Sequence, residues 1–481
     1  MGDPSSLGHL VAPSGARRSL GGLVMDHSAD LFQGELHKKV CGVIASACVP
    51  DPMERCIYEN LLFLKSTEAR GATAAISQLL AGGGATERLE LTAILQPAVP
   101  AELHAGIGWL PTVPTRLVDP GVVRTFAVKA LVHWVFRCFR RKLRPGAMLR
   151  AWVEVSLKMY GQEMDRSAPD IRVYPFPISL MRQVRFLASL RGRRLTWSFE
   201  GVPYRLADFI RALRGRLTDR GLAQAEAFGY LAHADELVRA GITTLYTSDE
   251  FEVGAVVMHQ RLGGSGVRSV NTAHGVGGYC PRIAYTEFRV ISRSQAAFYQ
   301  RDNPAIRYTL RANANRALVR LPPVPAGQTG RSVVYIHQNW EELGFTFEAG
   351  IQQRICSALT EVAKIPGIRI SLKVHPNSSK KTLAALRRDW PGAILRDFAD
   401  LPAIKPIFII MNSTTYFELG EAGPVLACKD HTLAPELYFG EGLDAFTLDA
   451  LRSRIAELMD DEAWAGALAR QKLQRAAELC L

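Results

Sequence analysis

Hydrophobic and polar positions in the second half of the chain alternate between short apolar runs and longer stretches with apolar residues every three or four positions. The runs at 333–336, 368–374, 406–411 and 425–428 predict strands. The longer patterns at 347–364, 383–389, 415–421, 448–459 and 462–479 predict helices. This alternation indicates a parallel sheet covered by helices on both faces.

The same alternation begins earlier, near residue 171. Expected strands lie at 172–176, 195–199, 242–246, 267–272 and 288–292, and expected helices at 179–190, 204–213 and 252–261. Residues 321–331 are rich in Pro and Gly without periodicity, which predicts a hinge. We therefore predict an α/β fold with two Rossmann-like lobes, residues 37–320 and 332–481, that face each other across a ligand-binding cleft.

The first part of the chain carries weaker patterns. Residues 1–36 contain no continuous apolar stretch, so we expect a disordered tail without a secretory signal or a membrane span. The apolar runs 40–49 and 89–95 are short and strand-like. The eight cysteines form no CxxC pair and have no His partners at zinc spacing, so we expect reduced thiols, no metal and a cytoplasmic protein.

Positive charge is concentrated in one region. The net charge is +12, and between residues 116 and 220 roughly 22 Lys and Arg stand against roughly 8 Asp and Glu. Residues 122–143 predict an amphipathic helix that ends in an arginine cluster, with this expected apolar face: Val123, Phe126, Ala130, Trp134 and Cys138. Such a helix fits the inner face of a membrane, a polyanionic glycan or an ordinary protein surface. No nucleic-acid module accompanies it, so nucleic acid is not an expected partner.

Polar residues follow the ends of two strands in the second lobe. Lys373 and His375 share one face of the strand at 368–374, Pro376 ends that strand, and residues 377–379 offer helix caps. Helix N-termini favour anions, so a phosphate fits here. The alternative is that His375 bonds a loop carbonyl and the two serines only cap the helix.

The second such turn follows the strand at 406–411. Asn412, Ser413 and Thr414 present hydroxyl, amide and backbone N–H groups where a helix begins, an arrangement that can bind phosphate or carboxylate oxygens. Thr415 and Glu418 also match the spacing of a capping box, which explains both without a ligand.

Two candidate bases lie in the first lobe. His274 precedes a glycine at a strand end and has a side chain suited to acid–base chemistry near neutral pH. Glu200 closes another expected strand and is either a general base or a solvated loop carboxylate.

These motifs, in this order, resemble the bacterial capsule and surface-polysaccharide transferases of GT-B type, including the polysialyltransferase, Kdo-transferase and CDP-glycerol glycerophosphotransferase groups. The resemblance covers residues 171–428. It rests on the His-Gly at 274–275, the Lys-x-His-Pro at 373–376 and the Asn-Ser-Thr-Thr turn at 412–415 before Gly-Pro-Val. Gln338, after the first strand of the second lobe, also resembles the opening of capsule-synthesis donor domains.

The resemblance implies residue roles and a reaction. His375 contacts the donor phosphate, with Ser413 and Thr414 on the phosphate or a donor carboxylate. The base is Glu200, the remaining acid of an acidic pair, or His274, as in the glycerophosphotransferase group. We expect inverting, metal-independent transfer without a cofactor, from a CMP-linked sialic-acid-like or Kdo-like sugar to a bacterial surface glycan or lipid-linked acceptor, with peripheral contact to the inner membrane. Alternatives are a CDP-glycerol-type transferase, a nucleotide-sugar 2-epimerase and a non-catalytic glycan-binding component.

Overall fold

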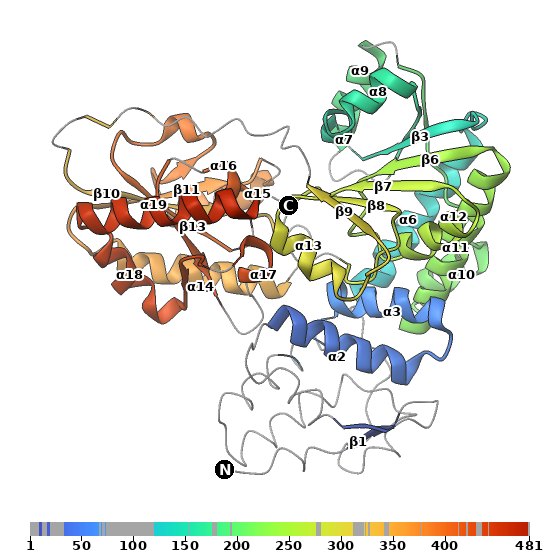
Figure 1. Ribbon diagram of the computed structural model, residues 1–481, viewed down its shortest axis with the longest axis horizontal. Helices are drawn as coiled ribbons and strands as arrows, with labels where there is room; N and C mark the ends of the chain where they lie inside the picture. The colour runs from blue at the N-terminus through green and yellow to red at the C-terminus, as the bar shows by residue number, and fades with distance from the viewer. Residues whose placement is uncertain are drawn as a thin grey trace. The chain divides into compact units, whose positions relative to one another are not determined.

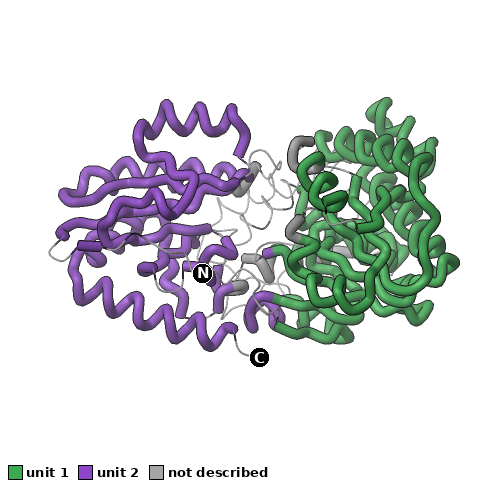
Figure 2. The backbone as a smooth tube through the Cα atoms, turned by 90° about the horizontal axis from the view of Figure 1, so that it is seen from above, with its two compact units in different colours: residues 1–274, 278–290, 299–311 green, residues 275–277, 291–298, 312–481 purple. Residues whose placement is uncertain are grey.

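The computed structural model describes residues 9–11, 17–19, 33–66, 69, 73, 120–152, 154–175, 180–192, 195–275, 280–310, 322, 324–325, 328–340, 346–376, 378–411, 413–419, 422–429, 435–440 and 442–479. The chain divides into two compact units, which Figure 2 colours separately. Unit 1 comprises residues 1–274, 278–290 and 299–311, and unit 2 comprises residues 275–277, 291–298 and 312–481. None of the described helices is both long enough and apolar enough to cross a membrane.

Unit 1 is built on a seven-stranded sheet in which every neighbouring pair is parallel. In chain order its strands are β3 (Gly146–Ala151), β4 (Asp170–Val173), β5 (Trp197–Phe199), β6 (Ile242–Thr247), β7 (Arg268–Thr272), β8 (Glu287–Val290) and β9 (Arg307–Leu310). Their order in the sheet is β5-β4-β3-β6-β7-β8-β9. Figure 1 labels β3 and β6 to β9 of this sheet. A separate antiparallel pair joins β1 (His9–Val11) to β2 (Arg17–Ser19).

Helices cover both faces of this sheet. The helices of unit 1 are α2 (Gln33–Cys48), α3 (Pro52–Lys65), α6 (Pro120–Cys138), α7 (Glu154–Met159), α8 (Gly161–Ser167), α9 (Leu180–Gly192), α10 (Leu206–Leu213), α11 (Asp219–Arg239) and α12 (Ala255–Gly264). Helix α13 (Arg293–Gln300) follows β8 in the chain and belongs mostly to unit 2. Leu149 and Ala151 of β3 point into a core with Leu157 and Phe186, from α7 and α9. Because side chains alternate along a strand, Arg150 points to the opposite face.

Unit 2 carries a six-stranded parallel sheet in the order β12-β11-β10-β13-β14-β15. Its strands are β10 (Arg331–His337), β11 (Ile368–Val374), β12 (Ile394–Leu395), β13 (Pro406–Ile410), β14 (Val425–Cys428) and β15 (Ala445–Phe446). Its helices are α14 (Thr346–Val362), α15 (Lys380–Asp389), η4 (Phe398–Asp400), α16 (Thr415–Glu418), α17 (Glu436–Phe439), η5 (Leu448–Ala450), α18 (Leu451–Glu457) and α19 (Asp461–Glu478). Every residue of the central strands β10 and β13 is buried.

The strand order of each sheet reverses at one point. In unit 1 the chain moves outward from β3 through β4 to β5 and then returns to β6 on the other side of β3; in unit 2 it does the same around β10 and β13. Neighbouring loops diverge at such a switch point, and open parallel sheets bind ligands there, at the carboxyl ends of the strands. Each unit therefore has one position where a ligand site is expected.

The predicted fold class is confirmed: both units are Rossmann-like parallel sheets. Strands β11 and β14 have the predicted bounds, and most other predicted strands and helices of 171–479 differ by a few residues at their ends. The hinge at 321–331 lies partly outside the described residues and stays a prediction, as does the tail at 1–36, although α2 already begins at Gln33.

Two predictions in the first part of the chain have other outcomes. The run 40–49 was expected to be a strand, but it belongs almost entirely to α2. Its buried residues Val40, Cys41, Ile44 and Ala45 recur with helical spacing, so one helix face explains them. The expected strand at 89–95 lies outside the described residues.

Candidate functional site

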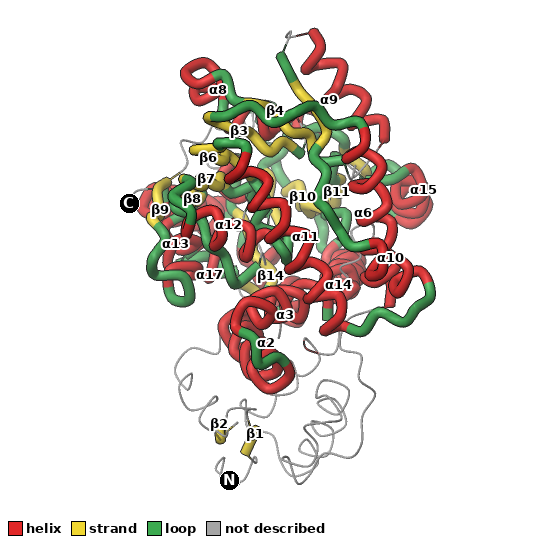
Figure 3. The backbone as a smooth tube through the Cα atoms, turned by 90° about the vertical axis from the view of Figure 1, so that its right-hand side faces the viewer, coloured by secondary structure: helices red, strands yellow, loops and turns green. Residues whose placement is uncertain are grey.

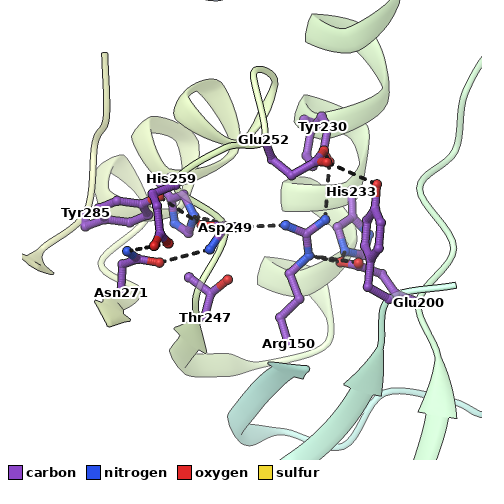
Figure 4. A network of polar contacts seen from close by, with 12 residues as sticks. Arg150, Glu200, Tyr230, His233, Thr247, Asp249, Glu252, His259, Asn271 and Tyr285 are labelled. Carbon is purple, nitrogen blue, oxygen red and sulfur yellow. Dashed lines mark hydrogen bonds and ion pairs between the residues drawn. The ribbon is translucent and has the colours of Figure 1, made fainter. Parts of the chain in front are cut away.

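A buried arginine organises the switch point of unit 1 (Figure 4). The Arg150 Nε donates to both carboxylate oxygens of Glu200 at 2.8 Å, and its Nη1 donates to Asp249 at 2.8 Å. All three side chains are completely buried. Arg150 thus ties the loop after β5 to the loop after β6.

Glu200, one of the two predicted bases, lies deep in this network. His233 on α11 also approaches it, with Nε2 at 2.9 Å from the carboxylate. Burial alone raises the pKa of Glu200, but the charge of Arg150 and the hydrogen bond from His233 outweigh burial and lower the pKa to about 2. A carboxylate this acidic accepts protons poorly near neutral pH, so its surroundings favour a role as the counter-ion of Arg150.

Asp249 holds the turn after β6 in a similar way. Besides Arg150, it contacts His259 Nε2 at 3.2 Å and accepts a hydrogen bond from the Tyr285 hydroxyl at 2.9 Å. Burial raises the pKa of Asp249, but His259 and Arg150 outweigh it, so the net pKa is lowered. The turn is therefore fixed by charge as well as by packing.

A second ionic cluster adjoins the first. Lys129 on α6 contacts Glu226 at 3.0 Å and Glu252 at 2.9 Å. The Tyr230 hydroxyl links the two clusters, because it donates to Glu252 and accepts from Arg150 Nη2 at 3.2 Å. Buried charges are tolerated only when paired and hydrogen-bonded, and these groups satisfy one another.

His274, the other predicted base, follows the end of β7 at the carboxyl edge of the same sheet, and its side chain is exposed. The buried carboxylate of Glu250 accepts the backbone N–H of His274 and a hydrogen bond from Asn271 Nδ2 at 3.2 Å. Burial raises the pKa of Glu250 to about 7, although these hydrogen bonds lower it. The structure thus fixes the backbone of His274 while the ring stays accessible.

The switch point of unit 2 is formed by the ends of β10 and β13. Gln338 directly follows β10, and both of its backbone groups are held by one buried side chain: Gln352 Oε1 accepts the Gln338 N–H at 2.8 Å, and Gln352 Nε2 donates to the Gln338 carbonyl at 2.9 Å. Gln352 comes from α14. This pairing leaves the Gln338 side chain on the wall of a pocket.

On the other side of that switch point, the Ser413 side chain is buried and donates to the Thr415 hydroxyl at 3.0 Å. Thr414 precedes the four-residue helix α16 and makes no side-chain cap bond. Since Thr415 lies inside α16, the capping box expected from Thr415 and Glu418 is not formed. Asn412 lies outside the described residues.

The Lys-x-His-Pro segment spans the end of β11, the strand beside β10. His375 and Pro376 lie just beyond the strand end, and the His375 carbonyl accepts the Ser378 N–H at 3.0 Å. Ser379 caps α15 by accepting the Thr382 N–H at 3.1 Å, as the sequence predicted for one of residues 377–379. His375 is thus placed one strand away from the switch point.

Lys373 lies near three carboxylates that the sequence did not place beside it. Its Nζ donates to the Val374 carbonyl at 3.1 Å and lies 5.3 Å from the centre of the Phe398 ring. Partial burial lowers the pKa of Lys373, while three nearby carboxylates raise it: Asp397, Asp400 and Glu418. Part of its charge is therefore already compensated within unit 2.

A pocket of about 420 Å³ opens beside Gln338 in unit 2. Its walls come from the end of β10 and from α14 and α15, and they include Gln352, Gln353, Thr382, Asp389 and Trp390. Amide and carboxylate groups beside an aromatic ring suit a flat polar group such as a nucleobase. The lining does not include His375, Ser413 or Thr414.

Sequence reasoning missed the residues that hold these edges. A search for exposed polar residues after strands does not find Arg150, Asp249 or Gln352, because all three are buried. The available signal was an arginine inside an otherwise small or apolar strand, where an unpaired charge is not tolerated. Among the described residues, no group of three or more His, Cys, Asp or Glu is arranged to hold a metal ion.

No family model matches the chain, and no curated protein matches it. Among solved structures, an α,α-trehalose-phosphate synthase (UDP-forming) from Burkholderia vietnamiensis is similar with 9% identity and a TM-score of 0.37, over 70% of this chain and 93% of that one. The wall teichoic acid polymerase TagF is similar with 10% identity and a TM-score of 0.33, over 74% of this chain and 90% of that one. The similarity is low, and the fold described above rests on this chain's own strand order and pairing.

Proposed function

We propose that this protein is a nucleotide-sugar-dependent glycosyltransferase in which unit 2 binds the donor and unit 1 supplies the base. The observation that carries the proposal is the polar chemistry at the carboxyl edges of the two sheets. Gln338, Ser413 and Thr414 flank the switch point of unit 2, and His274 is held at the carboxyl edge of unit 1. These are the positions where doubly wound sheets bind nucleotides and substrates.

In unit 2 we assign the donor phosphates to His375 and to the hydroxyl and backbone groups at Ser413 and Thr414. Hydrogen-bond donors that are already in place before the reaction stabilise developing negative charge without reorganising. They therefore favour the negative charge that builds up on the phosphate of the leaving nucleotide. Lys373 contributes less, because neighbouring carboxylates compensate its charge. We place the nucleobase of the donor in the pocket beside Gln338.

In unit 1 we assign the catalytic base to His274. An exposed imidazole on a fixed backbone can remove the proton of an acceptor hydroxyl, which then attacks the anomeric carbon as the nucleotide leaves. Glu200 acts through its ion pair with Arg150 instead, as a positioning residue. The motifs resemble those of CMP-donor transferases, so the proposed donor is CMP-linked and the proposed acceptor is a bacterial surface glycan or its lipid-linked precursor.

Thermal shift measurements with CMP, CDP, UDP and GDP test the proposal. Stabilisation by CMP supports the CMP-linked donor, stabilisation by CDP supports transfer from a CDP-glycerol-type donor, and stabilisation by UDP alone supports a 2-epimerase. Binding of a nucleotide raises the apparent stability by about 2.7 kcal/mol at 100 times Kd, which is readily detected. Stabilisation by none of the four contradicts the proposal and favours a glycan-binding component.

A further inference from the structure

Helix α6 carries apolar side chains on its exposed face as well as on its buried face. The buried face holds Val123, Phe126, Ala127 and Ala130 together with Lys129 and His133, and Arg137 pairs with Glu236 on α11. The exposed stripe is also apolar, with these exposed fractions: Val128 53%, Leu131 44%, Trp134 46%, Val135 45% and, just past the helix end, Phe139 76%. Of the apolar face expected from the sequence, Val123, Phe126 and Ala130 are buried, whereas Trp134 and Cys138 are exposed.

Helix α10 extends this apolar surface. It lies beside α6 (Figure 3) and exposes Leu206, Ile210 and Leu213, which recur every three or four residues along one stripe. Leu131 and Trp134 of α6 line one shallow hollow together with Leu206 and Phe209 of α10. The exposed stripes of α6 and α10, with Phe139, are called the α6–α10 surface below.

A larger and more open hollow lies at the Phe139 end of this surface. It has a volume of about 320 Å³ and is lined by Phe139, Arg141, Leu195, Trp197, Ser198 and Phe199. Three of these residues belong to the edge strand β5. The hollow is open to solvent and presents polar as well as apolar groups, with the cationic side chain of Arg141 in its wall.

Cationic side chains accompany the apolar surface. Exposed basic residues precede, follow or lie within the two helices, namely Arg124, Arg141, Lys142, Arg144, Arg205 and Arg214. None of the six pairs with a carboxylate of the described part of the chain. A second copy of this surface would bring like charges together, which is unfavourable, whereas an anionic lipid surface is complementary to both its charge and its apolar stripe.

We propose that the α6–α10 surface binds the face of an anionic lipid bilayer, with its apolar side chains at the boundary of the acyl chains and its arginines among the headgroups. Amphipathic surfaces of this composition lie in the interface plane rather than crossing the bilayer. The inference goes beyond the proposed transferase reaction and does not depend on it.

Flotation of the full-length protein with vesicles tests this. Vesicles of phosphatidylglycerol in phosphatidylcholine should bind the protein, vesicles of phosphatidylcholine alone should bind it far less, and added salt should weaken binding. Trp134→Ala and Phe139→Ser should each weaken binding about tenfold, since burying a large apolar side chain contributes that much. Lys142→Gln should weaken it roughly fivefold.

The matched control is Leu473→Ala, which removes a side chain that is 75% exposed on α19 of unit 2 and should leave vesicle binding unchanged. Circular dichroism checks that each variant is folded. Three results would overturn the proposal: no binding to anionic vesicles, equal binding by Trp134→Ala and the control, or a dimer in sedimentation velocity that Trp134→Ala dissolves in the absence of vesicle binding. No donor is added, so these outcomes are independent of the transferase proposal.

Discussion

Replacing Arg150 by methionine should destabilise unit 1 more than any exposed substitution, because it leaves two carboxylates without their cation. Glu200 and Asp249 both contact the guanidinium at 2.8 Å, and all three side chains are completely buried. Methionine fills a similar volume without charge, so the effect is electrostatic rather than a cavity. Breaking a buried ion pair by removing one partner costs about 3–5 kcal/mol.

The loss should depend on pH in a defined direction. In the wild type the folded-state pKa of Glu200 is about 2, below its ordinary value of 4.5, so its stabilising contribution is present above pH 4.5 and disappears as the pH falls through about 2. Without Arg150, burial dominates and the pKa values of both carboxyls rise. The difference in the free energy of unfolding between wild type and variant should therefore be largest at pH 7 and smaller near pH 4.

Urea denaturation of the full-length protein at pH 7 and pH 4, followed by circular dichroism, measures this. Arg211→Met is the matched control, because the Arg211 side chain is 64% exposed and makes only a long contact, 3.7 Å, with Asp208. Its substitution should change the free energy of unfolding by no more than about 0.5 kcal/mol. A loss below about 1 kcal/mol for Arg150→Met at pH 7, or the same loss at both pH values, would refute the reasoning.

Three further predictions concern single positions. Burial raises the pKa of Glu250 to about 7 in the folded state, so wild-type stability should fall as the pH rises from 4.5 through about 7; Glu250→Gln should remove that fall in a series of melting curves. Gly254→Ala should lower stability by about 1–3 kcal/mol in urea titration, because an added Cβ overlaps the Tyr230 ring; an unchanged midpoint would contradict this. Ser379→Ala removes the N-cap of α15 and should cost about 1 kcal/mol, whereas Ser379→Asp should restore most of it.

The fold was predictable where hydrophobic periodicity was uninterrupted. The all-apolar β13 and the alternating β11 are found at or within one residue of their predicted bounds. Strand β3 was not predicted, because Arg150 interrupts its apolar pattern; only the tertiary network shows why a charge belongs there. The 21-residue helix α11 was also missed, since its buried face mixes Glu226, Tyr230 and His233 with small residues and only two leucines.

The candidate site was predictable only as a set of strand-end residues. Topology places His375 and Ser413 at the same edge of the sheet, after β11 and β13, the two strands that flank β10, and periodicity and motif spacing suggested this shared edge. The environment of Glu200 was not predictable, because its partners Arg150 and His233 come from distant parts of the sequence. Likewise, no local pattern shows that Glu250 holds the backbone of His274. Roles that depend on burial and long-range pairing need the structure.

Release of nucleotide from CMP-, CDP-, UDP- and GDP-linked sugars, followed by chromatography, is the most direct test of a nucleotide-sugar transferase. The wild type should release nucleotide from the CMP-linked donor. His375→Ala should lose this activity while remaining folded, and Arg369→Ala, an exposed cation at the opposite end of β11, should retain it. Absence of release from every donor by the wild type, or full activity of His375→Ala, would contradict the proposed function and its donor site.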